Sequence, residues 1–177
     1  VILYILLTYL LIEVFTRKVL KYEMSEIGIP RLHVKGKWML TAFILPLAIT
    51  GIFLLLPGNF VNAQMTAAES AEAICLSVIL MGVGPGIVEE MIFRGVIMHL
   101  LEKKWGRAIA VVVPSVIFGL IHIIGTNYSL LSCLQVIAAG TFVGIMFSYI
   151  AIDENSIWNS AIAHGIWNMI IIGNILS

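Results

Sequence analysis

The sequence predicts an all-α integral membrane protein, folded as a polytopic helical bundle. Of its 177 residues, 60% are hydrophobic and 11% are charged, and the mean hydropathy is +1.06. Soluble domains carry roughly 25% charged residues, so a soluble fold of this length could not bury so much apolar surface. The apolar residues also recur in runs that approach the length of a membrane span.

The charges are unevenly distributed along the chain, although the formal net charge is zero. Six of the ten basic residues lie between Arg17 and Lys37, and none follows Arg107. This distribution offers no basic face for a nucleic acid beyond the N-terminal quarter. It is the asymmetry that membrane topology produces, with Lys and Arg concentrated in cytoplasmic loops.

The first apolar segment covers residues 1–16 and begins directly with Val, so we expect it to be part of a first spanning helix. Residues 17–37 are polar and basic, with Gly28 and Pro30 as helix breakers. They predict a cytoplasmic loop. The second span is predicted at 38–56.

The next loop, 57–70, contains neither Lys nor Arg and is expected on the far side of the membrane. A third apolar segment begins near Ala71 and reaches GVGPG at 82–86, where the glycines and proline should break or bend the helix. A new helix is predicted from about 86 to 101. It ends at EKKWGR, whose basic residues predict a return to the cytoplasm.

The remaining spans are predicted at 108–124, 130–151 and 157–176. A far-side loop, GTNYS, separates the first two, and a cytoplasmic turn, DENS, separates the last two. About six apolar segments result, with both ends of this chain on the non-cytoplasmic side.

Three charges interrupt the apolar chain in EEMIFR, at 89–94. Unpaired at membrane depth they would cost on the order of 8–10 kcal/mol together. Glu90 and Arg94 are four residues apart and can pair on one helix face. Glu89 is rotated by about 100° and stays available, and a helix starting at 86 would favour its ionised form. The alternative is that both acids merely mark a helix N-terminus.

Two further motifs place ionisable groups in apolar helices. FGLIH ends at His122 and HGIWN starts at His164, and each motif spans one helical turn. Counted from the nearest charged residue at the expected cytoplasmic boundary, Glu89, His122 and His164 lie about 21, 22 and 16 Å deep. An intramembrane cluster of ionisable groups indicates a functional site.

This set of side chains favours hydrolysis. A carboxylate and an imidazole can deprotonate a water, while a second imidazole and an amide can hydrogen-bond an oxyanion. Zinc binding is an alternative, because two His and one Glu are acceptable ligands, although HExxH is absent. Proton-coupled transport is a further alternative, without a sign of the internal repeat that such folds often show.

EEMIFR, FGLIH and HGIWN, in this order, resemble the motifs of the CAAX-processing and bacteriocin-processing (CPBP, or Abi) intramembrane proteases, the type II CAAX prenyl endopeptidases. The resemblance covers about residues 80–177, which it implies to be the catalytic membrane core. Residues 1–79 are expected to add N-terminal membrane helices to the same membrane domain. The family core usually has about eight spanning helices, two more than we count here.

The resemblance implies a glutamate-dependent intramembrane endopeptidase. Glu89 would be the general base, acting with His122 on the attacking water. His164 and Asn168 would form the oxyanion site. The supporting residues that it implies are Glu90, Arg94 and Phe118.

The resemblance also implies a protein or peptide substrate, lipidated in the eukaryotic branch, and a membrane lipid environment. It implies no nucleic acid, metal or other cofactor, with zinc left open. The expected location is a multi-pass position in the plasma membrane of a prokaryote. The alternative function is a non-catalytic membrane immunity or adaptor protein that binds a peptide in the same cavity.

Overall fold

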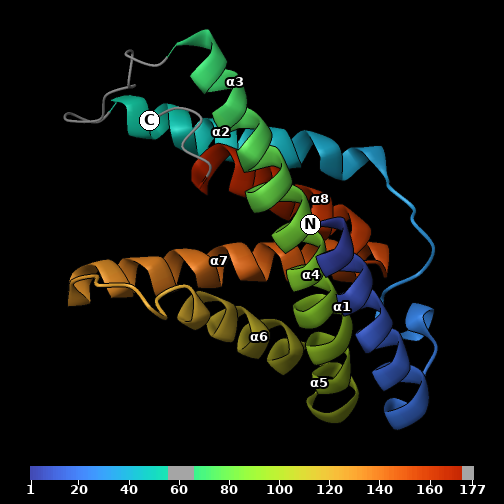
Figure 1. Cartoon of the computed structure of the whole chain (residues 1–177). Helices are drawn as coiled ribbons and strands as arrows, with labels where there is room; N and C mark the ends of the chain where they lie inside the picture. Colours follow the sequence, from blue (N-terminus) through green and yellow to red (C-terminus); the bar gives the residue numbers. More distant parts are fainter. Residues whose placement is uncertain (56–65, 173–177) are drawn as a thin grey trace.

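The computed structural model describes residues 1–55 and 66–172, and every regular element within these ranges is helical (Figure 1). Most of the expected loop 57–70 and the end of the sixth segment lie outside the described residues. The α-helices are α1 (Ile2–Phe15), α2 (Gly36–Leu55), α3 (Ala67–Leu76), α4 (Gly84–Glu90), α5 (Met98–Trp105), α6 (Arg107–Ile121), α7 (Leu130–Glu154) and α8 (Trp158–Trp167). Shorter π-helical segments are Thr16–Leu20, Ser77–Val83, Met91–Ile97 and Asn168–Ile172, and Met24–Ile27 is a 3₁₀ turn.

Most of the predicted segments correspond to helices. The predicted spans at 1–16, 38–56, 108–124 and 130–151 correspond to α1, α2, α6 and α7, with ends that differ by at most three residues. The sixth corresponds to α8 and its π-helical extension. Apolar runs flanked by charge or glycine therefore locate the helices well.

The chain passes through GVGPG without the predicted break, as the continuous α3–α4–α5 ribbon shows (Figure 1). Gly84 has right-handed helical angles, φ −64° and ψ −66°, and Pro85 lies in the first turn of α4. The π-helical segment that ends at Val83 has i→i+5 hydrogen bonds in place of i→i+4 bonds, so the hydrogen-bond pattern changes just before the proline. The N–H that Pro85 lacks is therefore missing in the first turn of α4, where its loss costs least. The predicted break is wrong, and so is the free helix N-terminus that it placed before Glu89.

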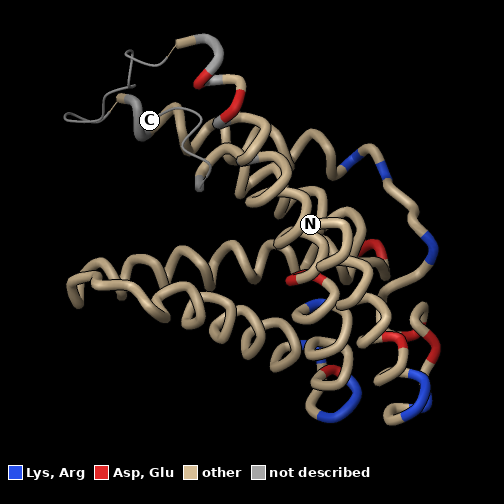
Figure 2. The backbone as a smooth tube through the Cα atoms, in the orientation of Figure 1, with Lys and Arg blue, Asp and Glu red and all other residues tan. Residues whose placement is uncertain are grey.

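The three segments that we predicted to be cytoplasmic, 17–37, 102–107 and 153–156, meet in the fold, because residues of all three line one cavity. Lys103 Nζ lies 3.4 Å from the centroid of the Tyr22 ring. Trp158 Nε1 donates a hydrogen bond of 2.8 Å to the carbonyl oxygen of Pro30. Figure 2 shows most basic residues along the right and lower edges of the molecule, while long stretches of the helices carry none. The segments that we predicted on one side of the membrane therefore lie on one side of the fold.

A cluster of charges fixes the start of α2 to the end of α7. The Glu154 side chain is only 1% exposed and pairs with Lys35 at 2.6 Å and with Lys37 at 3.1 Å. Trp38 Nε1 donates to Glu154 at 3.0 Å, and Lys37 also pairs with Asp153. Trp38, an aromatic residue of the kind found at membrane interfaces, thus also ties two helices together.

Within residues 1–55 and 66–172, two helices are long and apolar enough to cross a membrane: Ile74–Trp105, with 32 residues, and Leu130–Glu154, with 25. Apolar side chains also cover much of the outer surface. On α7, Leu130 is 78% exposed and Phe142 is 74% exposed. Large exposed apolar surfaces mark contact with lipid or another apolar partner. Membrane crossing by all six apolar segments stays a prediction.

Glycines allow the closest helix contacts. A Cβ added at Gly86 of α4 would meet backbone atoms of Ala161 and Gly165 of α8 at 3.0 Å. A Cβ added at Gly140 of α7 would lie 2.8 Å from the Cα of Gly119 of α6. Small residues let helix backbones approach closely in membranes, and here they bring α4, which carries the two glutamates, against α8.

We expect Gly86→Ala to destabilise the fold by roughly 1–3 kcal/mol, because the added methyl group would press on the α8 backbone. Thermal unfolding of the purified protein in detergent would measure this loss. Gly51→Ala is the matched control: a Cβ at Gly51 meets nothing within 4 Å, and alanine should gain roughly 0.5–1 kcal/mol in helix stability. Equal stability of the two variants would contradict the packing described here.

Candidate active site

A fully buried ion pair lies at the centre of the bundle. Arg94 Nη1 donates to Glu90 Oε1 at 2.7 Å, and both side chains are 0% exposed. The pair forms across one helical turn, from the end of α4 into the π-helical segment that follows, as the four-residue spacing predicts. Burial of two charges is costly unless they are paired and their remaining donors are satisfied, so the surroundings of Arg94 are informative.

The rest of the Arg94 guanidinium is held by α7 and by aromatic rings. Its Nη2 donates to the carbonyl oxygen of Gly144 at 2.8 Å. A Cβ at Gly144 would lie 3.2 Å from that nitrogen, so a glycine leaves the carbonyl accessible. The guanidinium carbon lies 5.0 Å from the ring centroid of Phe118 and 5.5 Å from that of Phe147. Such cation–π contacts add to the stabilisation of the buried charge.

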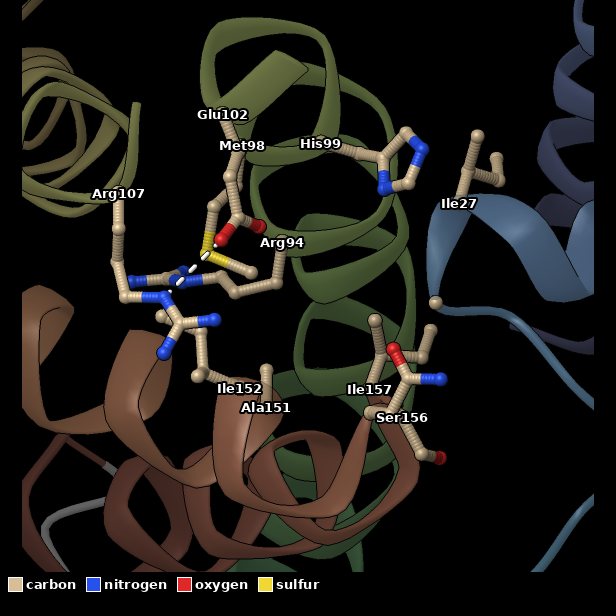
Figure 3. Close-up of a pocket in the computed structure, with 12 residues that line it drawn as sticks. Ile27, Arg94, Met98, His99, Glu102, Arg107, Ala151, Ile152, Ser156 and Ile157 are labelled. Carbon is tan, nitrogen blue, oxygen red and sulfur yellow. Dashed lines mark hydrogen bonds and ion pairs between the residues drawn. The ribbon is translucent and has the colours of Figure 1, made fainter. Parts of the chain in front are cut away.

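A small polar cavity of about 70 Å³ lies on the other side of Arg94 (Figure 3). Figure 3 shows the Arg94 side chain between Met98 and Arg107, with the ion pair of Arg107 Nε and Glu102 at 3.0 Å beside it. Arg94 Nε is buried and has no protein partner among the described residues. The cavity is polar and large enough for water, which would complete the hydrogen bonding of Arg94.

His164, on α8, lies between the two glutamates. Its Nδ1 is 3.1 Å from Glu90 Oε1, and its Nε2 is 3.7 Å from Glu89 Oε2. The imidazole stacks on Phe147, with centroids 4.7 Å apart and planes 23° apart. The structure therefore assembles Glu89, Glu90, Arg94 and His164 as one cluster, although Glu89 and Glu90 are adjacent on a helix.

His122 follows the last residue of α6, and its ring, like that of His164, contacts Phe118. The Phe118 centroid is 4.6 Å from the His122 ring and 5.4 Å from the His164 ring. His122 Nδ1 is 2.6 Å from the carbonyl oxygen of Phe118, so Nδ1 is the donor, and in the neutral ring Nε2 carries the lone pair. In the described part of the chain, the ion pairs of Glu89 include His164 and not His122.

An apolar cavity of about 340 Å³ joins the two histidines to Asn168. Asn168 Nδ2 donates one hydrogen to the carbonyl oxygen of Met81 at 3.1 Å, which leaves the second hydrogen available. The lining residues are Phe118, His122, Tyr128, Val136, Ala139, Gly140, Val143, His164, Trp167, Asn168 and Ile171. Polar groups thus converge at one wall of an otherwise apolar pocket, the usual form of a ligand site.

The sequence reasoning missed three contributors to this site. Phe147 stacks on His164 and is 0% exposed, Gly144 accepts from Arg94, and Tyr128 lines the cavity. A signal for Gly144 was present, because GTFVG at 140–144 is a G-x-x-x-G pattern, which favours close helix packing. A buried phenylalanine in an apolar helix carries no comparable signal.

Comparison with known proteins gives one result about the family. A family profile described as type II CAAX prenyl endopeptidase Rce1-like matches residues 71–170, more than half of the chain. This range contains all three motifs, and it extends from α3 into the π-helical segment after α8. No curated protein and no solved structure matches the chain significantly.

We expect Arg94→Met to destabilise the fold by about 3–5 kcal/mol, because it leaves the Glu90 carboxylate buried without its cation. Unfolding in detergent would again measure the change. Arg107→Met is the matched control, since its pair with Glu102 is largely exposed and should contribute about 1 kcal/mol or less. The double variant Glu90→Gln/Arg94→Met should recover part of the lost stability. If Arg94→Met lost no more stability than Arg107→Met, the result would contradict a structural role for the pair.

Proposed function

Because the chain belongs to the Rce1-like family of type II CAAX prenyl endopeptidases, we propose that it is an intramembrane endopeptidase. It hydrolyses peptide bonds of membrane-associated or CAAX-type proteins with a water activated by glutamate and histidine. The observation that carries this proposal is that His122, His164 and Asn168 line one apolar cavity, while Glu89 Oε2 lies 3.7 Å from His164 Nε2.

Glu89 is the proposed base. Its side chain is 26% exposed, whereas that of Glu90 is 0% exposed and occupied by Arg94 and His164. Of these two adjacent acids, Glu89 is therefore the one whose side chain water can reach. His122 assists from α6, because its Nε2 lone pair can accept a hydrogen bond from the same water once a substrate closes the site.

His164 and Asn168 are the proposed donors to the oxyanion. They are one helical turn apart on α8 and its extension, and both line the cavity. Asn168 Nδ2 has one hydrogen left after its bond to the Met81 carbonyl. Two fixed donors in a water-poor site stabilise a tetrahedral intermediate more than the same donors would in water.

The cavity supports a substrate with apolar groups. Beyond the polar wall its lining is aliphatic and aromatic, with Val136, Val143 and Ile171 among the residues. Its volume of about 340 Å³ is at the lower end of the range for ligand pockets. An extended peptide carrying an apolar side chain or a lipid group fits this chemistry; a nucleic acid does not. We place the protein in the plasma membrane of a prokaryote as a multi-pass protein, a proposal that its apolar exposed helices support.

We expect Glu89→Gln to lower peptidase turnover by at least about 10²-fold while the protein stays folded, because the amide cannot accept the proton of water. Cleavage of a membrane-anchored reporter in proteoliposomes would measure turnover. Glu72→Gln is the matched control, an exposed acid on the same continuous helix, and should keep full activity.

Retained turnover in a folded Glu89→Gln variant would refute the assignment of the base. If wild type and Glu89→Gln also gave the same cellular phenotype at equal protein levels, the immunity or adaptor alternative would gain support. Comparative proteomics of membranes that contain either protein would identify the substrate as a precursor that accumulates with the variant.

We expect activity to survive dialysis against EDTA, because the carboxylate and imidazoles supply the proton transfers without a metal ion. Residual activity would be measured after chelation, with EDTA preloaded with Ca²⁺ as the control for effects of the chelator itself. Loss of activity that Zn²⁺ restores would favour the zinc alternative, in which Glu89 and a histidine serve as ligands.

A further inference from the structure

The His164 ring is fixed on three sides. Its Nδ1 is 3.1 Å from Glu90, one face stacks on Phe147 at 4.7 Å, and the ring meets Phe118 edge-on with an interplanar angle of 76°. His164 is only 1% exposed. The ring therefore has no free direction in which to rotate, and each nitrogen keeps its own neighbour.

The proton on Nδ1 follows from Glu90. Oxygen Oε1 of Glu90 accepts from Arg94 Nη1 at 2.7 Å and is also the atom that faces His164 Nδ1. A carboxylate held by an arginine is an acceptor only, so Nδ1 must be the donor. The neutral ring with Nδ1–H would carry no hydrogen on Nε2 and could not serve as an oxyanion donor.

The other nitrogen faces a second carboxylate. His164 Nε2 is 3.7 Å from Glu89 Oε2, and both atoms are buried without a hydrogen bond among the described residues. Two lone pairs that face each other at this distance repel. One proton between them removes the repulsion and balances the cluster: two carboxylates against Arg94 and a protonated His164. Neutrality of a buried cluster is strongly favoured at membrane depth.

We propose that Glu89 and His164 share one proton, which rests on His164 Nε2, and that Glu90 and Phe147 are the positioning residues that hold the ring for it. This inference rests on the proposed function and deepens it. The resting site then holds an ionised Glu89, ready to act as base, and an Nε2–H that can donate to the oxyanion. The π face of Phe147 favours the cationic ring.

The reaction balances with this arrangement. Water attacks the substrate carbonyl carbon, its O–H bond breaks, and the proton passes to Glu89, while the carbonyl oxygen becomes an oxyanion hydrogen-bonded by His164 Nε2–H. Glu89 then gives that proton to the amide nitrogen, the C–N bond breaks, and acid and amine leave. His164 keeps its proton throughout, so the next cycle starts from the same state.

The charged and titratable groups around His164 determine which nitrogen carries hydrogen, so the experiment must observe the ring nitrogens themselves. Glu89 and Glu90 face it from one continuous helix, Arg94 pairs with the same Glu90 oxygen, and the His122 ring contacts Phe118, which also contacts His164. Solution NMR of protein labelled with ¹⁵N-histidine in detergent micelles reads both ring nitrogens directly. The chain has four histidines, so the His164→Gln spectrum identifies the His164 signals by difference.

Near neutral pH we expect both nitrogens of His164 to carry hydrogen in the wild type. Glu89→Gln should lose the Nε2 hydrogen and leave the neutral Nδ1–H ring. Phe147→Leu should reduce the protonated population and lower kcat about tenfold or more with KM nearly unchanged, since Phe147 is not among the residues that line the substrate cavity. Phe142→Leu, a 74% exposed phenylalanine on the same helix, is the control and should change neither.

A wild-type ring with hydrogen on Nε2 alone would overturn the inference, as would a protonated ring that persists in Glu89→Gln. If Phe147→Leu fails to fold, the comparison of wild type with Glu89→Gln still shows whether Glu89 and His164 share the proton. The spectra need no substrate, so they test the shared proton independently of the peptidase activity. The expected ring states without any peptidase activity would refute the proposed function and leave the shared proton in place.

Discussion

The buried pair of Glu90 and Arg94 is the interaction on which the rest of the site depends. Two charges at this depth are tolerable only when they are paired and most of their polar atoms have partners, and several of these partners come from other helices. Gly144 of α7 accepts from Arg94, Phe118 of α6 covers it, and His164 of α8 shares the Glu90 oxygen. One ion pair thus fixes three helices relative to α4, and with them the residues of the proposed reaction.

The buried ion pair also requires close packing of the helices around it. Arg94 reaches the Gly144 carbonyl only because no side chain lies between them, and Glu90 reaches His164 because α4 and α8 meet at glycines. Without water in the bilayer core, van der Waals contact and buried hydrogen bonds hold the helices together. The glycines therefore allow the buried charges to be paired as well as the helices to pack, since a longer distance between the helices would leave the charges without partners.

The sequence predicted the fold and the site to different extents. Apolar runs located α1, α2, α6 and α7 to within three residues, and four-residue spacings predicted the Glu90–Arg94 pair. The continuity of the helix at Pro85 was missed, because a π-helical turn depends on hydrogen-bond register, which composition does not encode. The contact of Glu89 with His164 was missed because rotation along one helix does not determine how a second helix packs against it.

That contact changes how the adjacent glutamates are understood. Their 100° separation suggested that one acid works and the other only supports the structure, yet both face the same imidazole from its two nitrogens. The acid that binds Arg94 also determines which nitrogen of His164 carries a fixed proton, and so which nitrogen remains for the reaction. In the proposed reaction, the proton that Glu89 takes from water is matched by the negative charge that forms on the substrate oxygen, so the total charge of site and substrate stays constant in a medium that penalises net charge. In the proposed mechanism the two adjacent carboxylates thus have different roles that meet at one ring: Glu90 holds the imidazole at Nδ1, and Glu89 faces Nε2 and acts as the base.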